Sequence, residues 1–255
     1  MTSHTERAEP VSEPGGRAEV PERVRELVLG ARLVLWDFDG PVCRLFAGHP
    51  ADRVAGELVA WLEGMGFKDL LPQEEQSHPD PMVLLGAVNR RHRRSDLVAE
   101  FEERLTREEL RAVPTAWPTP YADPLIRTWT ALGTGLAITT NNSPRVVSRY
   151  LATRGLLDCF APHIYGRTRD PHLLKPDPHH LNRALDAMSA APGQALMLGD
   201  SPADAAAARR AGVPFLGYAR NGRKEEQLRS AGEEVLVHSL EAVLRVVREE
   251  RATRQ

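Results

Sequence analysis

The sequence predicts an α/β fold: a doubly wound, Rossmann-like parallel sheet with a helical cap inserted after its first strand. Two observations lead to this prediction. Short runs of continuous apolar residues recur along the chain, and polar residues and then a helical pattern follow each run. Such runs are typical of parallel strands that are covered on both faces. Between the first run and the second, from residue 48 to residue 120, helical patterns occur without any strand-like run.

Composition narrows the classes of protein to consider. The chain has 255 residues, of which 42% are hydrophobic and 27% charged, as expected for a soluble globular protein with a real core. The net charge of −2 gives no general attraction to nucleic acid or to a membrane. The two cysteines have no framework spacing, which favours a reducing compartment, and we expect a cytoplasmic protein. Residues 1–25 begin with a polar, Pro- and Gly-containing stretch and are expected to form a flexible tail.

The predicted sheet contains five strands. Each run is of strand length, and none alternates polar with apolar residues, which indicates burial on both faces. The runs are residues 33–36, 136–139, 163–165, 195–198 and 213–216. The first of them, LVLW, is expected to be the central strand.

Helix-start signals follow the strands. A capping side chain precedes a proline at Ser143, Asp177 and Ser201, and proline suits the first turn of a helix. The predicted helices cover residues 144–154, 178–190 and 202–211, and Gly212 ends the last of these. A final helix is predicted over residues 240–248, where Leu and Val recur at helical spacing.

The inserted stretch has the texture of a small helical bundle. Val54, Leu58, Trp61, Leu62 and Met65 lie on one face of a helix. A second helix is expected to open at Asp80 and Pro81, and Leu97, Val98, Phe101 and Leu105 stripe a third. We therefore expect a core domain from residues 26–43 and 121–255. The cap would span residues 44–120, with tethers near residues 43–48 and 114–122.

Polar residues gather where the predicted strands end. In an open parallel sheet, ligands bind beyond the carboxyl ends of the strands, so these groups are expected to share one site. Asp37 and Asp39 follow the first strand, two positions apart, so both side chains point to the same side of an extended chain. The other groups expected at this edge are Thr140, Asn141, Lys175, Asp200 and Asp204.

So many carboxylates cannot all stay ionised without a counter-charge. Lys175 supplies one positive charge, and a bound Mg²⁺, which prefers carboxylate and water ligands, would supply two. The same groups would hold a phosphate well, together with backbone N–H groups at helix starts. A metal-assisted phosphoryl transfer follows, with one aspartate as the nucleophile and the other as the acid and base.

The chain resembles the haloacid dehalogenase-like superfamily of phosphohydrolases. Within that superfamily it resembles the branch with a helical cap and is similar to phosphoglycolate phosphatases. Four motifs carry the resemblance, in the family's order. They are DFDGP at residues 37–41, LAITTNNS at residues 136–143, LLKPDP at residues 173–178 and MLGDSPADAAAARRAG at residues 197–212.

The resemblance implies a role for each residue. Asp37 would be the nucleophile that forms an aspartyl phosphate, and Asp39 the acid that protonates the leaving oxygen and then the base that activates water. Asp200 would ligate Mg²⁺ together with Asp37 and the backbone carbonyl of Asp39, with Asp204 in support. The residues expected to bind the phosphate are Gly40, Thr140, Asn141 and Lys175. The implied substrate is a small phosphorylated metabolite, and the protein would be a monomer or a homodimer.

Several alternatives stay open on the sequence alone. Thr139 competes with Thr140 as the phosphate-binding hydroxyl, and Pro41 stands where the family usually has Thr or Val. The basic run at residues 90–94 is expected to be a solvated helix face, with substrate recognition as the alternative. A phosphomutase would use the same two aspartates, and a non-catalytic phosphate-binding protein would retain the fold. An intact Asp39 argues against the non-catalytic reading.

Overall fold

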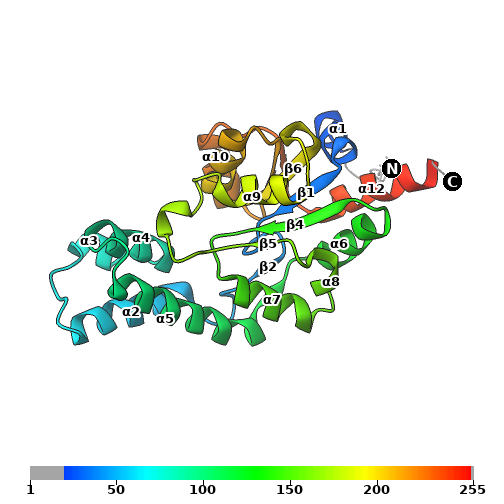
Figure 1. Cartoon of the computed structure of the whole chain (residues 1–255). Helices are drawn as coiled ribbons and strands as arrows, with labels where there is room; N and C mark the ends of the chain where they lie inside the picture. The colour runs from blue at the N-terminus through cyan, green and yellow to red at the C-terminus, as the bar shows by residue number, and fades with distance from the viewer. Residues whose placement is uncertain (1–19, 254–255) are drawn as a thin grey trace, which may run out of the picture.

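The computed structural model describes residues 20–253, and its centre is a six-stranded parallel sheet (Figure 1). The strands lie in the order β5-β4-β1-β6-β7-β8, and every neighbouring pair is parallel. Their bounds are β1 Leu33–Trp36, β4 Gly135–Thr139, β5 Ile164–Tyr165, β6 Ala195–Gly199, β7 Phe215–Tyr218 and β8 Leu236–Val237. This order confirms the predicted doubly wound α/β fold, with β1 in the interior of the sheet.

Helices cover both faces of the sheet, and β1 shows how. Val34 and Trp36 belong to one buried hydrophobic cluster, and Leu33 and Leu35 to another, because successive side chains of a strand point to opposite faces. The first cluster includes residues of α1 (Glu22–Gly30), α6 (Ala122–Ala131), α7 (Pro144–Thr153), α8 (Leu157–Phe160) and α12 (Leu240–Thr253). The second includes residues of α9 (His179–Ala187) and α10 (Pro202–Ala211).

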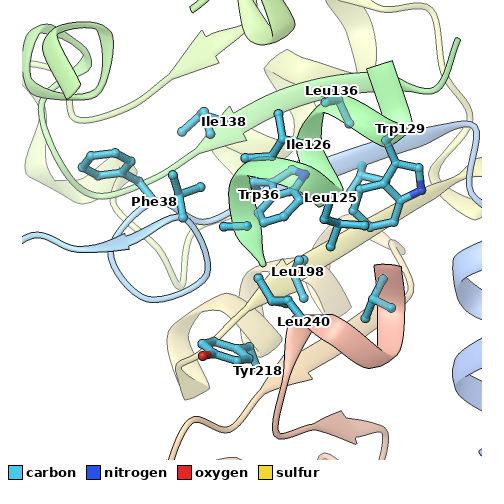
Figure 2. Packing of buried hydrophobic residues seen from close by; sticks show 14 of the residues in the cluster. Trp36, Phe38, Leu125, Ile126, Trp129, Leu136, Ile138, Leu198, Tyr218 and Leu240 are labelled. Carbon is cyan, nitrogen blue, oxygen red and sulfur yellow. The ribbon is translucent and has the colours of Figure 1, made fainter. Parts of the chain in front are cut away.

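Aromatic packing fixes α6 against the central strand. Trp36 of β1 meets Trp129 of α6 edge-to-face, with ring centroids 5.7 Å apart, and Leu125 and Ile126 pack beside them (Figure 2). Edge-to-face contact is a preferred geometry for aromatic rings and adds about 1 kcal/mol to the burial of their area. Trp36 is therefore a core residue, and its packing anchors the end of β1, directly before Asp37.

A helical unit is inserted between β1 and α6 and has a hydrophobic cluster of its own. Its helices are α2 (Ala51–Gly64), α3 (Gln73–Gln76), α4 (Pro81–Arg91) and α5 (Asp96–Ala112), here called the cap helices (Figure 1). Val54, Leu58, Leu84 and Phe101 are among the residues buried between them. The two connections pair as antiparallel strands, β2 (Cys43–Arg44) and β3 (Trp117–Pro118), so they enter and leave side by side.

The remaining elements are short. Helix α11 spans Gly222–Ser230 after β7, and three 3-10 turns lie at Val113–Thr115, Pro171–Leu173 and Pro192–Gln194. Among the described residues, no helix is long and apolar enough to cross a membrane.

The structure corrects several predicted boundaries. The tail assigned to residues 1–25 is too long, because α1 begins at Glu22 and buries Val24 and Val28, one turn apart; residues 1–19 lie outside the described residues. The predicted strand 213–216 lies two residues later, because Gly212 ends α10 in a left-handed conformation and the chain must turn before it can extend. Strand β8 was missed, and Met65 lies beyond α2 with 53% of its surface exposed.

We predict that His180 makes the stability of the fold depend on pH. The side chain is fully buried on α9, and neither ring nitrogen has a hydrogen-bond partner among the described residues. Burial lowers the pKa of His180 to about 3. The unfolded chain therefore binds a proton below about pH 6.5, whereas the folded chain binds it only near pH 3, so stability is lost as the pH falls through this window.

Replacing His180 by Leu should remove this dependence. Between pH 8 and pH 5 the free energy of unfolding of the wild type should fall by about 2 kcal/mol more than that of His180→Leu, as measured by urea denaturation. Exposed His172 gives the matched control, because His172→Leu should leave the pH profile unchanged. Equal profiles for wild type and His180→Leu would contradict the prediction.

Candidate active site

The polar residues predicted to gather at the carboxyl edge of the sheet do so. A cavity of about 540 Å³ is lined by Asp37 and Asp39 after β1, Thr140 and Asn141 after β4, Lys175 before α9, and Asp200 and Asp204 after β6. Phe46, Ala51 and residues 79–82 of the inserted unit complete its wall. The cavity therefore lies between the sheet edge and the cap helices.

Lys175 is the cation at the centre of this site. Its Nζ donates to Asp37 Oδ1 at 2.7 Å, to the carbonyl of Thr139 at 3.0 Å and to Asp204 Oδ1. Burial lowers the pKa of Lys175, but the charges of Asp204 and Asp37 outweigh burial, and the net pKa is raised. The ammonium group is therefore charged throughout the physiological range.

Asn141 delivers Lys175 to this position. Its side-chain oxygen accepts from the N–H of Lys175 at 2.7 Å, and its side-chain nitrogen donates to the carbonyl of Lys175 at 3.1 Å. The amide is thus engaged in both directions by the backbone of the lysine loop. Asn141, predicted to bind phosphate, lines the cavity and also joins two of the loops that form the site.

The carboxylates exceed the single charge of Lys175. Burial and then the charge of Asp204 raise the pKa of Asp37 to about 7, although Lys175 opposes them. Burial raises the pKa of Asp39 to about 6, and burial raises that of Asp200 to about 6 against the charge of Lys224. Burial is the largest cause of each of these shifts, and for Asp37 and Asp200 the charges of neighbouring carboxylates add to it.

Three of these carboxylates are placed to hold a divalent cation. Asp37, Asp200 and Asp204 each offer an oxygen within 4.8 Å of the others, and all three residues are buried. Hard carboxylate oxygens suit Mg²⁺ or a similar ion. The burial of these carboxylates and the spacing of their oxygens together fit a bound metal.

Asp204 differs from Asp37 and Asp200 because hydrogen bonds occupy both of its carboxylate oxygens. One oxygen contacts Lys175, and the other accepts from the N–H groups of Asp200 and Ser201 and from the hydroxyl of Ser201 at 2.7 to 3.2 Å. The hydroxyl of Ser201 accepts in turn from the N–H of Asp204, which makes a capping box at the start of α10. Both oxygens already have partners, so Asp204 is suited to orienting Lys175.

The turn after Asp39 allows Asp200 to approach. Gly40 has φ +142°, and a Cβ on it would lie 2.4 Å from Asp200 Cγ, so only glycine fits. The turn is closed by the N–H groups of Val42 and Cys43, which both donate to the carbonyl of Phe38. Pro41 lies between these bonds and has no N–H to satisfy, which explains why a proline is tolerated there.

The side chains of the adjacent residues Thr139 and Thr140 point to opposite sides of the chain. The hydroxyl of Thr139 points into the core, 3.4 Å from the sulfur of Met197, whereas Thr140 lines the cavity. Neighbouring residues at the end of a strand face opposite ways, so only one of them can reach the site. The geometry places Thr140 at the cavity, as the sequence analysis favoured.

Sequence reasoning missed three cations near the site. Arg220 and Lys224 both contact Oδ2 of Asp200, at 3.3 and 2.9 Å. With Arg44 they line a second cavity of about 560 Å³, which shares several residues with the first, among them Asp39, Asp200 and Lys224. Arg220 follows the end of β7, so the strand-end rule that found the acids could have found it as well.

The basic run of the inserted unit does not reach the cavity. Arg90 and Arg91 pair with Glu75, and Arg94 pairs with Asp170 of the core at 2.9 Å. None of the three lines either cavity. The expectation of a solvated helix face therefore describes these arginines better than substrate recognition does.

The protein is a Rossmann-like α/β protein. Its parallel sheet carries an acidic cluster at the carboxyl edge, and a helical unit is inserted after the first strand. The sequence comparison identifies the family. The chain belongs to the haloacid dehalogenase-like hydrolases, whose family profile matches residues 31–212. That match contains all eight predicted site residues and the inserted helices.

Two curated relatives are phosphoglycolate phosphatases. The one from Rhodospirillum rubrum is 37% identical over 105 residues, which are 40% of this chain and 43% of the relative. The one from Thiobacillus denitrificans is 35% identical over 107 residues, which are 40% of this chain and 46% of the relative. The matched stretch thus spans less than half the length of either relative.

Solved structures share the fold at low sequence identity. A predicted phosphoglycolate phosphatase from Haemophilus somnus superposes with a TM-score of 0.61 at 18% identity, covering 85% of this chain and 98% of that one. A haloacid dehalogenase-like family hydrolase from Streptococcus pneumoniae gives 0.58 at 17% identity, covering 89% and 100%. These likenesses support the fold.

We predict that Gly40→Ala disrupts the candidate metal site. The added Cβ would collide with the carboxylate of Asp200, and the positive φ disfavours any side chain. Titration calorimetry with MgCl₂ should show affinity reduced about tenfold or more, the size of effect seen when support for a metal ligand is lost.

Gly30→Ala is the control, because a Cβ there meets nothing within 4 Å and the backbone is helical. It should bind Mg²⁺ as the wild type does. Wild-type affinity in folded Gly40→Ala would show that the close approach of Gly40 to Asp200 does not matter for the metal.

Proposed function

We propose that this protein is a Mg²⁺-dependent phosphatase that hydrolyses a phosphate monoester of a small molecule through an aspartyl phosphate. The observation that carries the proposal is the buried cluster of Lys175 with Asp37 and Asp204, which stands beside Asp39 and Thr140 at one cavity. Membership of the haloacid dehalogenase-like hydrolases and the names of the two curated relatives support the same activity.

Each residue has a place in the proposed reaction. A carboxylate oxygen of Asp37 attacks phosphorus and forms the new O–P bond, while the bond from phosphorus to the leaving oxygen breaks. Asp39 gives its proton to the leaving oxygen. In the second step Asp39 takes a proton from water, the water oxygen attacks phosphorus, and the bond to Asp37 breaks to release inorganic phosphate.

The pKa of Asp39 suits both halves of this cycle. At about 6, the carboxyl group can carry a proton in one step and lose it in the next near neutral pH. One of its oxygens accepts from the N–H of Leu45 at 2.9 Å, which fixes the carboxyl group to the first tether of the inserted unit. Movement of that tether would move the acid.

The other residues hold and neutralise the phosphoryl group. Lys175 and the hydroxyl of Thr140 face the cavity and would donate to phosphoryl oxygens. Asp37, the backbone carbonyl of Asp39 and Asp200 would hold the metal, and Gly40 keeps the backbone close to it. When bound, Mg²⁺ neutralises charge on the phosphate and on the carboxylates.

The cap helices would enclose the substrate. Phe46, Ala51 and Met82 already contribute to the wall of the cavity. Closure over a bound phosphate excludes bulk water and strengthens each charge interaction inside. We therefore assign residues 44–120 the role of a cap, which leaves the α/β core to carry the chemistry.

Asp37→Asn should abolish turnover. The amide cannot attack phosphorus, so phosphate release from monoesters in the presence of MgCl₂ should fall by at least about a thousandfold, while thermal unfolding stays cooperative. Thr139→Val, which changes a hydroxyl buried in the core, is the control that should retain activity. Normal turnover by Asp37→Asn would refute the nucleophile, and phosphoryl transfer between substrate positions without phosphate release would indicate a mutase.

The three cations of the second cavity favour a substrate whose leaving group is anionic. Arg44, Arg220 and Lys224 line this cavity beside Asp39, the proposed acid, where the leaving group would lie. Phosphoglycolate, which carries a carboxylate beyond its ester oxygen, matches this arrangement. The two curated relatives are named for that substrate.

This preference can be measured by comparing phosphoglycolate with uncharged 2-hydroxyethyl phosphate. The wild type should favour phosphoglycolate in kcat/KM, and Arg44→Gln should reduce the ratio between the two substrates about tenfold, the effect of losing one charge-assisted hydrogen bond. Arg53→Gln on α2, whose side chain is exposed and paired with Glu57, should leave the ratio unchanged. An unaltered ratio in Arg44→Gln would refute the proposed carboxylate contact.

A further inference from the structure

A buried ion pair joins the cap helices to the core behind the cavity. Arg167, which follows β5, donates through Nη1 to Glu109 Oε1 at 2.9 Å and through Nη2 to Glu109 Oε2 at 2.8 Å. Glu109 lies on α5, and both side chains are fully buried. Neither residue lines either cavity, so neither is placed to touch a substrate.

Arg167 uses its remaining donors on both sides of the interface. On α5 it contacts Glu102 and Thr106, at 2.9 and 2.8 Å. On the core side Nη1 donates to the carbonyl of Asn141 at 3.1 Å, and the backbone N–H donates to the carbonyl of Asn142 at 2.9 Å. The guanidinium group thus holds α5 against the loop that follows β4.

Glu109 acts on the same loop from the opposite direction. Its Oε1 accepts from Nδ2 of Asn142 at 2.9 Å, and its Oε2 accepts from the N–H of Ser143 at 3.3 Å. A carboxylate only accepts hydrogen bonds, so it requires the nitrogen side of the Asn142 amide to face it. The oxygen side of that amide must then face the other way.

The oxygen of Asn142 faces Thr140. The hydroxyl of Thr140 donates to Asn142 Oδ1 at 3.1 Å, and the N–H of Asn142 donates back to the hydroxyl oxygen at 3.1 Å. The hydroxyl has one proton, so a bound phosphate would take that proton over from Asn142 Oδ1, while the N–H of Asn142 would continue to hold the hydroxyl oxygen in place. A continuous set of hydrogen bonds therefore runs from Arg167 through Glu109 and Asn142 to the hydroxyl that faces the cavity. Asn142 and Thr140 line the cavity, whereas Glu109 and Arg167 lie outside it.

We infer that Glu109 and Arg167 are positioning residues, which hold the loop at Asn142 and Ser143 in place and thereby fix the position of the Thr140 hydroxyl oxygen at the cavity. The inference rests on the role proposed above for Thr140. It means that a residue of the cap controls phosphate affinity from outside the cavity, by a contact that the cap makes with the core.

Two other ion pairs between the inserted unit and the core are exposed. Arg145 of α7 contacts Glu103 at 2.7 Å, and Arg94 contacts Asp170 at 2.9 Å, but the two arginine side chains are 60% and 76% exposed. Exposed pairs are screened by water and salt and contribute little. Glu103, on the same helix as Glu109, therefore provides a matched control.

The test measures the affinity for inorganic phosphate by calorimetry in MgCl₂, well below the unfolding temperature. Glu109→Gln should weaken phosphate binding about tenfold, the cost of one misplaced hydrogen bond, while the affinity for Mg²⁺ alone stays unchanged. Glu103→Gln should bind phosphate as the wild type does. If Glu109→Gln fails to fold because Arg167 has lost its two-bonded carboxylate partner, the double variant Glu109→Gln/Arg167→Met removes both charges and should show the same loss.

Non-additivity separates positioning from a general structural role. If Glu109 acts through Asn142, the variant Asn142→Ala combined with Glu109→Gln should lose no more phosphate affinity than Asn142→Ala alone. Losses that add in full, or wild-type phosphate affinity in folded Glu109→Gln, would overturn the inference. A wild type that binds phosphate but hydrolyses no monoester would overturn the proposed function instead, and the affinity series would still decide this inference.

Discussion

The site depends on one buried interaction, the ammonium group of Lys175 between Asp37 and Asp204. Without that cation, two buried carboxylates would face each other with no counter-charge between them, and one of them would have to bind a proton. The interaction requires that the loops carrying Asp37, Lys175 and Asp204, which follow three different strands, bring these side chains within hydrogen-bonding distance. Trp36 packed on Trp129, the amide of Asn141 and the capping box at Ser201 each fix one of these loops.

Residues that follow the strands were predictable because one rule covers them all. Parallel strands end at the same edge, so the polar residues after β1, β4 and β6 had to meet, whatever the details of the helices. The inner position of β1 followed from its wholly apolar run, which only a strand covered on both faces can bury. The start of β7 was predicted two residues too early, because the chain must first turn after Gly212 and the length of that turn is not encoded by apolar periodicity.

Glu109 and Arg167 could not be recognised in this way. Glu109 is one of several glutamates on α5, and nothing in the local pattern separates it from Glu103 or Glu108, which lie near the surface. Its partner is 58 positions away and follows a two-residue strand. What distinguishes the pair is burial against the loop after β4, which arises only when the inserted helices and the core are packed together.

The position of this ion pair also bears on how a cap could move. Removing one partner of a buried pair, or separating the two, leaves a charge without water or counter-charge, so the contact resists rupture. Glu109 lies within one turn of the end of α5 at Ala112, next to the tether that leads to β3. Rotation about the tethers displaces atoms near them least. If the inserted helices open as proposed, Glu109 would stay on Arg167 while α2 and α4 move away from the cavity, and the Thr140 hydroxyl proposed to bind phosphate would keep its position as substrate enters.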